Sequence, residues 1–318
     1  MTDLMERLER GPVICAEGYL FELERRGYLQ AGGFVPEVVL EHPEKVAGLH
    51  REFIHAGSDV VEAFTYYAHR EKLRLIGREE LLERINREAL RIAGEVAAES
   101  DALLAGNVCN TNVWTGAESR EAVRAMFEEQ VAWAVEADVD FVIAETISWL
   151  GEALTATEVI KEAGLPAVVT VTAHRDPDMR DGVTPAEACR RLEAAGADVV
   201  GLNCSRGPQT MLPLLGEIRE AVSVPVAALP VPYRTSEQQP SSNRSRTRRD
   251  TSSPVAGHFR PRSTRSLAPA TRSQTSPSPR MSWGWAISAF AAARRRTTSA
   301  PWPRPSVAPH PPAAIQRT

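Results

Sequence analysis

A cysteine and a glutamate, both able to take part in catalysis or ligand binding, follow short apolar runs of the sequence. Cys204 comes after the run Val199–Leu202 and Asn203, and Glu145 comes directly after Phe141–Ala144. An ionised thiol can bind a metal ion or act as a nucleophile, and a carboxylate can accept hydrogen bonds from an ammonium group. The alternative for Cys204 is a small buried hydrophobic side chain. For Glu145 the alternative is a salt bridge at the rim of the fold, which we disfavour because the preceding run is entirely apolar.

The elements that must position these side chains repeat one pattern along residues 12–230. Short β-branched runs alternate with amphipathic stretches rich in Ala, Glu, Leu and Arg, as in parallel strands covered by helices. Three segments each contain a turn, a buried run and a polar residue at its carboxyl end: His55–Phe64, Ala137–Glu145 and Ala195–Cys204. Active sites of βα-barrels lie at the carboxyl ends of the strands, so we expect Glu145 and Cys204 at one mouth of a barrel.

Four further runs bring the predicted strands to seven: Val13–Ala16, Ala102–Asn107, Ala167–Val171 and Val224–Leu229. Nothing beyond Tyr233 supplies an obvious eighth. We therefore predict an α/β fold, a (β/α)8 TIM barrel over residues 1–240, with the eighth strand and final helix missing or replaced. Residues 241–318 are rich in Arg, Ser and Pro and lack helical or strand periodicity, so we predict a disordered tail there.

The formal net charge of −4 hides a split between these two parts. Residues 1–240 hold 23 Lys and Arg against 40 Asp and Glu, whereas residues 241–318 hold 14 Arg, no Lys and one acid, Asp250. One interpretation is an acidic globular body with a basic arm that binds nucleic acid. We disfavour it because aromatic residues are few in the tail and Lys is absent, and because a GC-rich gene read out of frame yields such an Arg, Ala, Pro and Ser mixture.

Composition and cysteine usage indicate which class of protein this is and where it is located. A chain of 318 residues with 43% hydrophobic content can bury a large core. It shows neither a secretory leader nor an apolar run long enough to span a bilayer, so we expect a cytoplasmic protein without membrane contact. The four cysteines have no CxxC spacing, disulfides are not expected, and three of them are interpreted as structural thiols: Cys15, Cys109 and Cys189.

Several motifs resemble one family closely. Gly201–Cys204 is similar to the first zinc-ligand motif of homocysteine S-methyltransferases. Leu49–Phe53, Ala56–Val61 and Phe64–Tyr67 resemble the betaine–homocysteine branch in particular. The resemblance runs from about residue 12 to residue 239. It implies an enzyme that moves a methyl group from a cationic donor, betaine-like or a sulfonium, to the thiol of homocysteine to give methionine.

The resemblance also implies a cofactor and its ligands. Family members hold zinc with three thiolates, one after the sixth strand and two adjacent ones after the eighth, and homocysteine sulfur takes the fourth position. Cys204 corresponds to the first of these ligands. Zinc would lower the pKa of the substrate thiol and align it with the methyl group. The partners we expect are small molecules, homocysteine and the methyl donor, and not nucleic acid; self-association into a homo-oligomer stays open.

Substrate contacts follow from the same resemblance. Glu145 corresponds to the family glutamate that meets the amino group of homocysteine. Asn203, which directly precedes Cys204 in the zinc-ligand motif, is a further candidate for substrate binding. Aromatic faces recognise cationic donors, and Tyr67 is expected to face the donor. Tyr66 could equally be a core aromatic. Phe34 occupies the position where the betaine enzymes carry a tryptophan.

The first predicted strand departs from the family pattern. Family members have an acid followed by glycines at its end, whereas this chain has Ala16-Glu17-Gly18, with the acid displaced by one position. Glu17 and Gly18 remain candidates for substrate binding. A shift of one residue at a strand end can turn a side chain away from the site.

The C-terminal part departs further, because the expected Gly-(Gly/Val)-Cys-Cys-Gly ending has no counterpart and no two cysteines are adjacent. The genetic code offers an explanation. Reading the third base of each codon with the first two of the next, Ser282–Ala293 permits L-G-L-G-Y-L-G-V-C-C-G. We infer a one-base frameshift near residues 240–242, and we expect the chain as written to be an impaired methyltransferase. A different barrel enzyme with a single-cysteine site is a further alternative.

Overall fold

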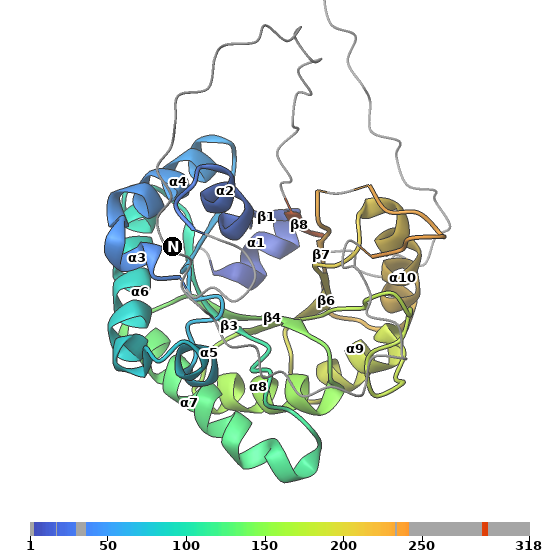
Figure 1. The fold of residues 1–318 in the computed structure, drawn as a ribbon. Helices are drawn as coiled ribbons and strands as arrows, with labels where there is room; N and C mark the ends of the chain where they lie inside the picture. Colours follow the sequence, from blue (N-terminus) through green and yellow to red (C-terminus); the bar gives the residue numbers. More distant parts are fainter. Residues whose placement is uncertain (1–2, 17, 30–35, 233, 242–287, 292–318) are drawn as a thin grey trace, which may run out of the picture.

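The computed structural model describes residues 3–16, 18–29, 36–232, 234–241 and 288–291 of the 318. Seven parallel strands form one curved sheet, which confirms the predicted TIM-barrel architecture. The strands are β1 (Val13–Cys15), β2 (Val60–Glu62), β3 (Leu103–Cys109), β4 (Phe141–Ile147), β5 (Ala167–Val171), β6 (Val199–Asn203) and β7 (Val226–Leu229). Figure 1 shows the helices as a ring around this sheet.

The helices follow the amphipathic stretches of the sequence. They are α1 (Leu4–Arg10), α2 (Tyr19–Arg25), α3 (Val38–Glu41), α4 (Pro43–His55), α5 (Arg70–Leu75), α6 (Leu82–Ala98), α7 (Arg120–Glu136), α8 (Leu150–Glu162), α9 (Pro185–Ala194) and α10 (Pro208–Ala221), with short 3-10 turns at Glu79–Leu81 and Ala117–Ser119. The start of α9 shows the local cause: the Thr184 hydroxyl accepts from the Glu187 amide, and Pro185 takes the first turn.

The eighth position of the barrel differs from the sequence-based expectation. A short strand, β8 (Ser288–Ala291), lies between β1 and β7 and is antiparallel to both. It comes from a segment in which the sequence analysis identified no strand, and it replaces the parallel eighth strand that was predicted to be missing or replaced. The parallel strand and following helix of a complete barrel are replaced here, and no helix follows β8 within the described residues. Pairing with β8 covers sheet edges that β1 and β7 would otherwise expose.

Two apolar layers hold the barrel together. Inside the barrel, α1 contributes Leu4 and Leu8, which pack against residues at the amino ends of the strands, such as Val60 and Phe141. This helix therefore packs at the amino ends of the strands, and Glu145 and Cys204 lie at the carboxyl ends. A larger layer between the strands and the outer helices buries side chains from α6 to α10.

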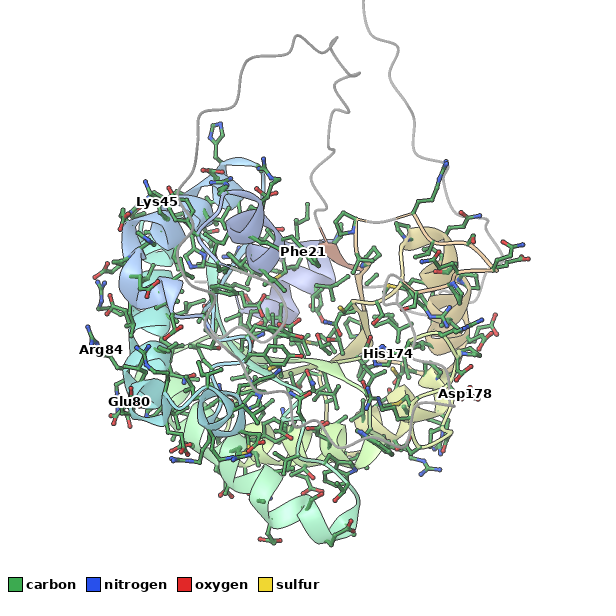
Figure 2. All side chains as sticks on the ribbon, in the orientation of Figure 1. Phe21, Lys45, Glu80, Arg84, His174 and Asp178 are labelled. Atoms are coloured by element: carbon green, nitrogen blue, oxygen red, sulfur yellow. The ribbon has the colours of Figure 1, made fainter. Side chains whose placement is uncertain are left out.

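Exposed charged side chains lie on the outer side of the helix ring. Figure 2 shows Glu80 and Arg84 at the outer edge of the helix ring, whereas His174 lies on its inner side.

No helix among the described residues is long and apolar enough to cross a membrane. The tail predicted for residues 241–318 falls, apart from Ser241 and β8, outside the described residues.

Candidate active site

The mouth at the carboxyl ends of the strands gathers a polar cluster from four of them. Glu62 ends β2, Asn107 lies in β3, Glu145 lies in β4 and Asn203 ends β6. Cys204 follows Asn203 directly, so Glu145 and Cys204 share one mouth of the barrel. Each of these side chains follows an apolar run that is buried between the barrel interior and the outer helices.

Glu145 is fixed by two asparagines from neighbouring strands. Asn107 donates from Nδ2 to Glu145 Oε1 at 2.7 Å, and Asn203 donates from Nδ2 to Glu145 Oε2 at 2.9 Å. Asn203 is held in turn by Thr146, whose backbone amide donates to Asn203 Oδ1 at 2.8 Å. The carboxylate therefore has a defined orientation at the centre of the mouth.

Glu62 joins this cluster, and the sequence analysis did not single it out. Its Oε1 accepts from Asn107 Nδ2 at 2.6 Å, and the side chain is 3% exposed. One amide nitrogen thus bridges two carboxyl groups. A signal was present in the sequence, because Glu62 ends the run Val60-Val61 in the way that Glu145 ends its own run.

The two carboxyl groups are electrostatically coupled. Burial raises the pKa of Glu145 to about 7, and the hydrogen bonds from Asn107, Thr146 and Asn203 act against that rise. Burial, together with the charge of Glu145, holds the pKa of Glu62 well above its ordinary range. Two carboxylates so close repel each other when both are ionised, so the pair retains a proton near neutral pH.

The aromatic pair lies at the end of β2, at the same mouth. The rings of Tyr66 and Tyr67 have centroids 4.3 Å apart, and both side chains are half-buried. The ammonium of Lys72, on α5, lies 3.9 Å from the centroid of the Tyr67 ring. The backbone of Tyr67 has a φ of 63°, and its amide donates to Cys109 Sγ at 3.3 Å. The Tyr67 face is thus already a site for a cation.

Cys204 sits in an unusual backbone conformation. Both Cys204 and Ser205 have positive φ, at 58° and 56°, and the Cys204 amide donates to the Leu229 carbonyl on β7 at 3.0 Å. Burial raises the pKa of the Cys204 thiol, with the charge of Glu145 as a smaller cause. The thiol is therefore kept in its protonated form, which is a poor metal ligand.

A hydrogen-bonded cluster of His174 with two serines, the His174 cluster, lies next to Cys204, and the sequence analysis missed it. His174 Nδ1 and the Ser205 hydroxyl are 3.1 Å apart, and His174 Nε2 and the Ser148 hydroxyl are 3.0 Å apart. Burial lowers the pKa of His174, with Arg180 and Arg206 as further causes. The imidazole is therefore neutral and helps to fix the turn that follows β6.

The remaining predicted residues are placed as follows. Gly18 precedes α2 with a φ of 101°, a left-handed conformation that favours glycine. Glu17 and Phe34 lie outside the described residues. Three cysteines interpreted as structural, Cys15, Cys109 and Cys189, are buried free thiols.

The donors for zinc are incomplete in the described part of the chain. No group of three or more His, Cys, Asp and Glu side chains is placed there to hold a metal ion. A catalytic zinc site takes three protein ligands and one open position. Cys204 supplies one ligand of the three, so the described residues do not fit a catalytic zinc ion.

The described strands form a TIM barrel, and a carboxylate, an aromatic pair and a thiol lie at one mouth, where barrels place their binding sites. The model of the homocysteine S-methyltransferase family matches residues 14–259, and the chain belongs to this family. The structure is also similar to the metallated form of the homocysteine methyltransferase MmuM from Escherichia coli, with a TM-score of 0.61 and 19% identity over 70% of this chain and 85% of that one. At that identity the likeness supports the fold alone.

Two curated relatives differ in the methyl donor that their names give. The chain is 40% identical over 224 residues to betaine–homocysteine S-methyltransferase 1 of Xenopus tropicalis, covering 69% of this chain and 55% of the relative. It is 39% identical over 220 residues to the S-methylmethionine–homocysteine S-methyltransferase BHMT2 of Pongo abelii, covering 69% and 59%. The chain thus spans little more than half the length of these relatives.

Proposed function

We propose that the barrel is the homocysteine-binding body of a methyltransferase. The observation that carries this proposal is the orientation of Glu145 by Asn107 and Asn203, at the same mouth as Cys204. In this arrangement the amino group of homocysteine meets the Glu145 carboxylate, and its thiol extends toward Cys204. Family membership supports homocysteine as the substrate.

The methyl donor is a cation recognised by the face of Tyr67. A betaine-like ammonium and a sulfonium share the positive methyl-bearing centre that an aromatic face attracts. The names of the relatives support both classes. Lys72 lies over the same ring, so a donor must displace its ammonium or bind beside it. Transfer would depend on holding the thiol in line with the methyl group.

The family resemblance implies zinc, but the donors of the described residues do not fit it. A free homocysteine thiol, with a reference pKa of about 8.5, stays mostly protonated near neutral pH. Within the described site, the thiol of Cys204 has a raised pKa and supplies no base for the substrate. We therefore propose that this chain binds homocysteine through Glu145 but does not convert it to methionine. We also propose that correcting the frameshift near residues 240–242, which restores the adjacent cysteine pair, restores zinc binding.

Reduced cysteines support the proposed cytoplasmic location. All four cysteines are free thiols, and such thiols persist in a reducing compartment.

Calorimetric titration with L-methionine, the expected product, tests the binding proposal without needing zinc. We expect the native chain to bind L-methionine and the Glu145→Gln variant to bind it at least about tenfold more weakly, because a charge-assisted hydrogen bond contributes roughly 1.5–3 kcal/mol. Glu152→Gln is the matched control, since Glu152 is also a buried acid but hydrogen-bonds to Thr111. Equal affinity in the native chain and the Glu145→Gln variant would contradict the proposal.

A further inference from the structure

Glu62 is buried at the mouth without a complete set of partners. Its Oε1 accepts from Asn107, but its Oε2 has no hydrogen-bond partner among the described residues. The side chain is 3% exposed, so bulk water does not compensate readily for that oxygen. An unpaired buried acceptor destabilises the folded state, because it has lost its hydrogen bonds to water without gaining others. The barrel keeps this cost although an apolar side chain at position 62 would avoid it.

A second unpaired acceptor lies beside the first. Asn107 directs its Nδ2 to both carboxyl groups, which leaves its own Oδ1 buried and without a partner among the described residues. The cluster thus presents two unsatisfied oxygens, from Glu62 and Asn107, next to the Glu145 carboxylate. When both carboxyl groups are ionised, all three groups accept hydrogen bonds, so the missing partner of the ionised cluster is a compact group with several donors. A primary ammonium has three N–H donors and no acceptor.

No cation of the chain itself fills this role within the described residues. The ion pairs of the structure include neither Glu62 nor Glu145, and the charges that shift the pKa of Glu62 come from Glu145 alone. The neighbouring titratable groups, Tyr66, Cys109 and Cys204, are neutral acids with raised pKa values. A positive charge at this cluster must therefore come from a ligand.

The neighbouring strand supplies no carboxyl group to this side of the mouth among the described residues. β1 pairs with β2 and ends at Cys15, and Ala16 follows it. Glu62 places a buried acid at the end of β2, the next strand of the sheet. The carboxyl group on this side of the described mouth is therefore that of Glu62.

We propose that Glu62 is a second carboxylate for the substrate's α-ammonium, which Glu62, Asn107 and Glu145 hold together. This inference rests on the proposed function, because it assigns a further residue to the same substrate. It accounts for the two orphan oxygens and for the bridging position of Asn107. It also predicts that the site selects ligands with a primary ammonium over analogues that lack one.

Two ligands and three substituted chains test the inference. L-methionine and its analogue without the amino group, 4-(methylsulfanyl)butanoate, are titrated calorimetrically into the native chain, Glu62→Gln, Glu145→Gln and the control Glu152→Gln. Glutamine retains an acceptor for Asn107 but removes the charge. We expect Glu62→Gln to weaken L-methionine binding about tenfold to a hundredfold and to leave the analogue within about twofold of the native chain.

Thermal unfolding supplies the readout that separates ligand binding from a structural role. Removing a buried carboxyl with an unsatisfied oxygen should raise the midpoint of unfolding in Glu62→Gln and in Glu62→Met, even as L-methionine binding weakens. A structural role predicts a lower midpoint and equal weakening of both ligands.

The outcomes distinguish the inference from the function on which it rests. Unchanged L-methionine affinity in Glu62→Gln, with a loss in Glu145→Gln, would overturn the inference alone. Parallel weakening of both ligands in Glu62→Gln would also overturn it. A native chain that binds L-methionine no better than the Glu145→Gln variant would overturn both the proposed function and the inference.

Discussion

Asn203 donates a hydrogen bond from Nδ2 to Glu145 Oε2 at 2.9 Å, which ties the end of β6 to β4 across β5. The next residue after Asn203 is Cys204. The side chain proposed to bind the amino group of homocysteine and the residue proposed to lie near its sulfur are therefore positioned by one contact. Replacing Asn203 therefore tests whether this contact positions the side chains at the mouth.

Replacing Asn203 with Leu should lower the free energy of unfolding by roughly 1–3 kcal/mol, because the Thr146 amide and one Glu145 oxygen lose partners at a buried position. Urea denaturation measures this change, and calorimetry should show weaker L-methionine binding. The control Gln209→Leu, at the exposed start of α10, should change stability by less than about 0.5 kcal/mol. Equal effects of the two substitutions would show that Asn203 does not organise the site.

Glu145 should make the stability of the barrel depend on pH. Its pKa is raised to about 7 in the folded state from an ordinary value of 4.5, so the folded chain binds more protons than the unfolded chain between these values. The favourable contribution is therefore present below about pH 4.5 and is lost as the pH rises through 7. Urea titrations from pH 5 to pH 8 should show a steeper loss of stability in the native chain than in Glu145→Gln. Identical slopes would contradict the shift.

L-methionine binding should follow the opposite trend with pH. An ammonium pairs with the ionised carboxylate, so affinity should increase between pH 6 and pH 8 as Glu145 loses its proton. Calorimetric titrations at several pH values measure this trend, and the Glu145→Gln variant should largely lose it. An affinity that falls over this range would argue against the carboxylate as the amino-group partner.

Lys72 should compete with external cations for the face of Tyr67. Replacing Lys72 with Met vacates a position 3.9 Å from the ring centroid, so tetramethylammonium should bind about two- to thirtyfold more tightly. The matched control is Lys45→Met, because Lys45 lies over the ring of Tyr28 at 5.7 Å. Competition calorimetry measures both variants. If the donor site lies elsewhere, Lys72→Met and Lys45→Met will bind tetramethylammonium with the same affinity. A third variant, Tyr67→Leu, will then bind it as tightly as the native chain.

Gly201 should not tolerate a side chain. A Cβ at this position would overlap the backbone of Ala227 on the adjacent strand β7. Gly201→Ala should therefore separate β6 from β7 and destabilise the fold by several kcal/mol, on the order of the larger effects seen for overpacking. Thermal unfolding checks this, with Gly216→Ala in α10 as the control because a Cβ there meets nothing within 4 Å. A native-like midpoint for Gly201→Ala would contradict the close strand approach.

Much of the architecture was predictable because strand signals in this chain are local. Runs such as Phe141–Ala144 are apolar on both faces and end in a polar residue, which fixes both the element and its exposed end. The antiparallel strand β8 was not predictable in the same way. Ser288–Ala291 carries no period of its own, and its place depends on the open edges of β1 and β7, which are far away in the sequence.

The site was predictable in part. Glu145 and Cys204 follow strands whose carboxyl ends must meet, so their common mouth could be inferred from sequence. Glu62 was missed because its importance depends on the bridge through Asn107, a contact between residues 45 positions apart. The His174 cluster was missed for the same reason, since it forms through side chains of separate turns.

Methionine formation by the chain as written and by its frame-restored counterpart tests the central claim most directly. The second version carries a one-base insertion near the codon for Ser241, which brings the upstream reading frame into the one that encodes the adjacent cysteine pair. Both are incubated with zinc, homocysteine and either betaine or S-methylmethionine, and methionine is quantified by mass spectrometry. We predict turnover only in the restored chain, because Cys204 alone cannot hold zinc. Methionine formation by the chain as written, at a rate similar to the restored one, would contradict the account.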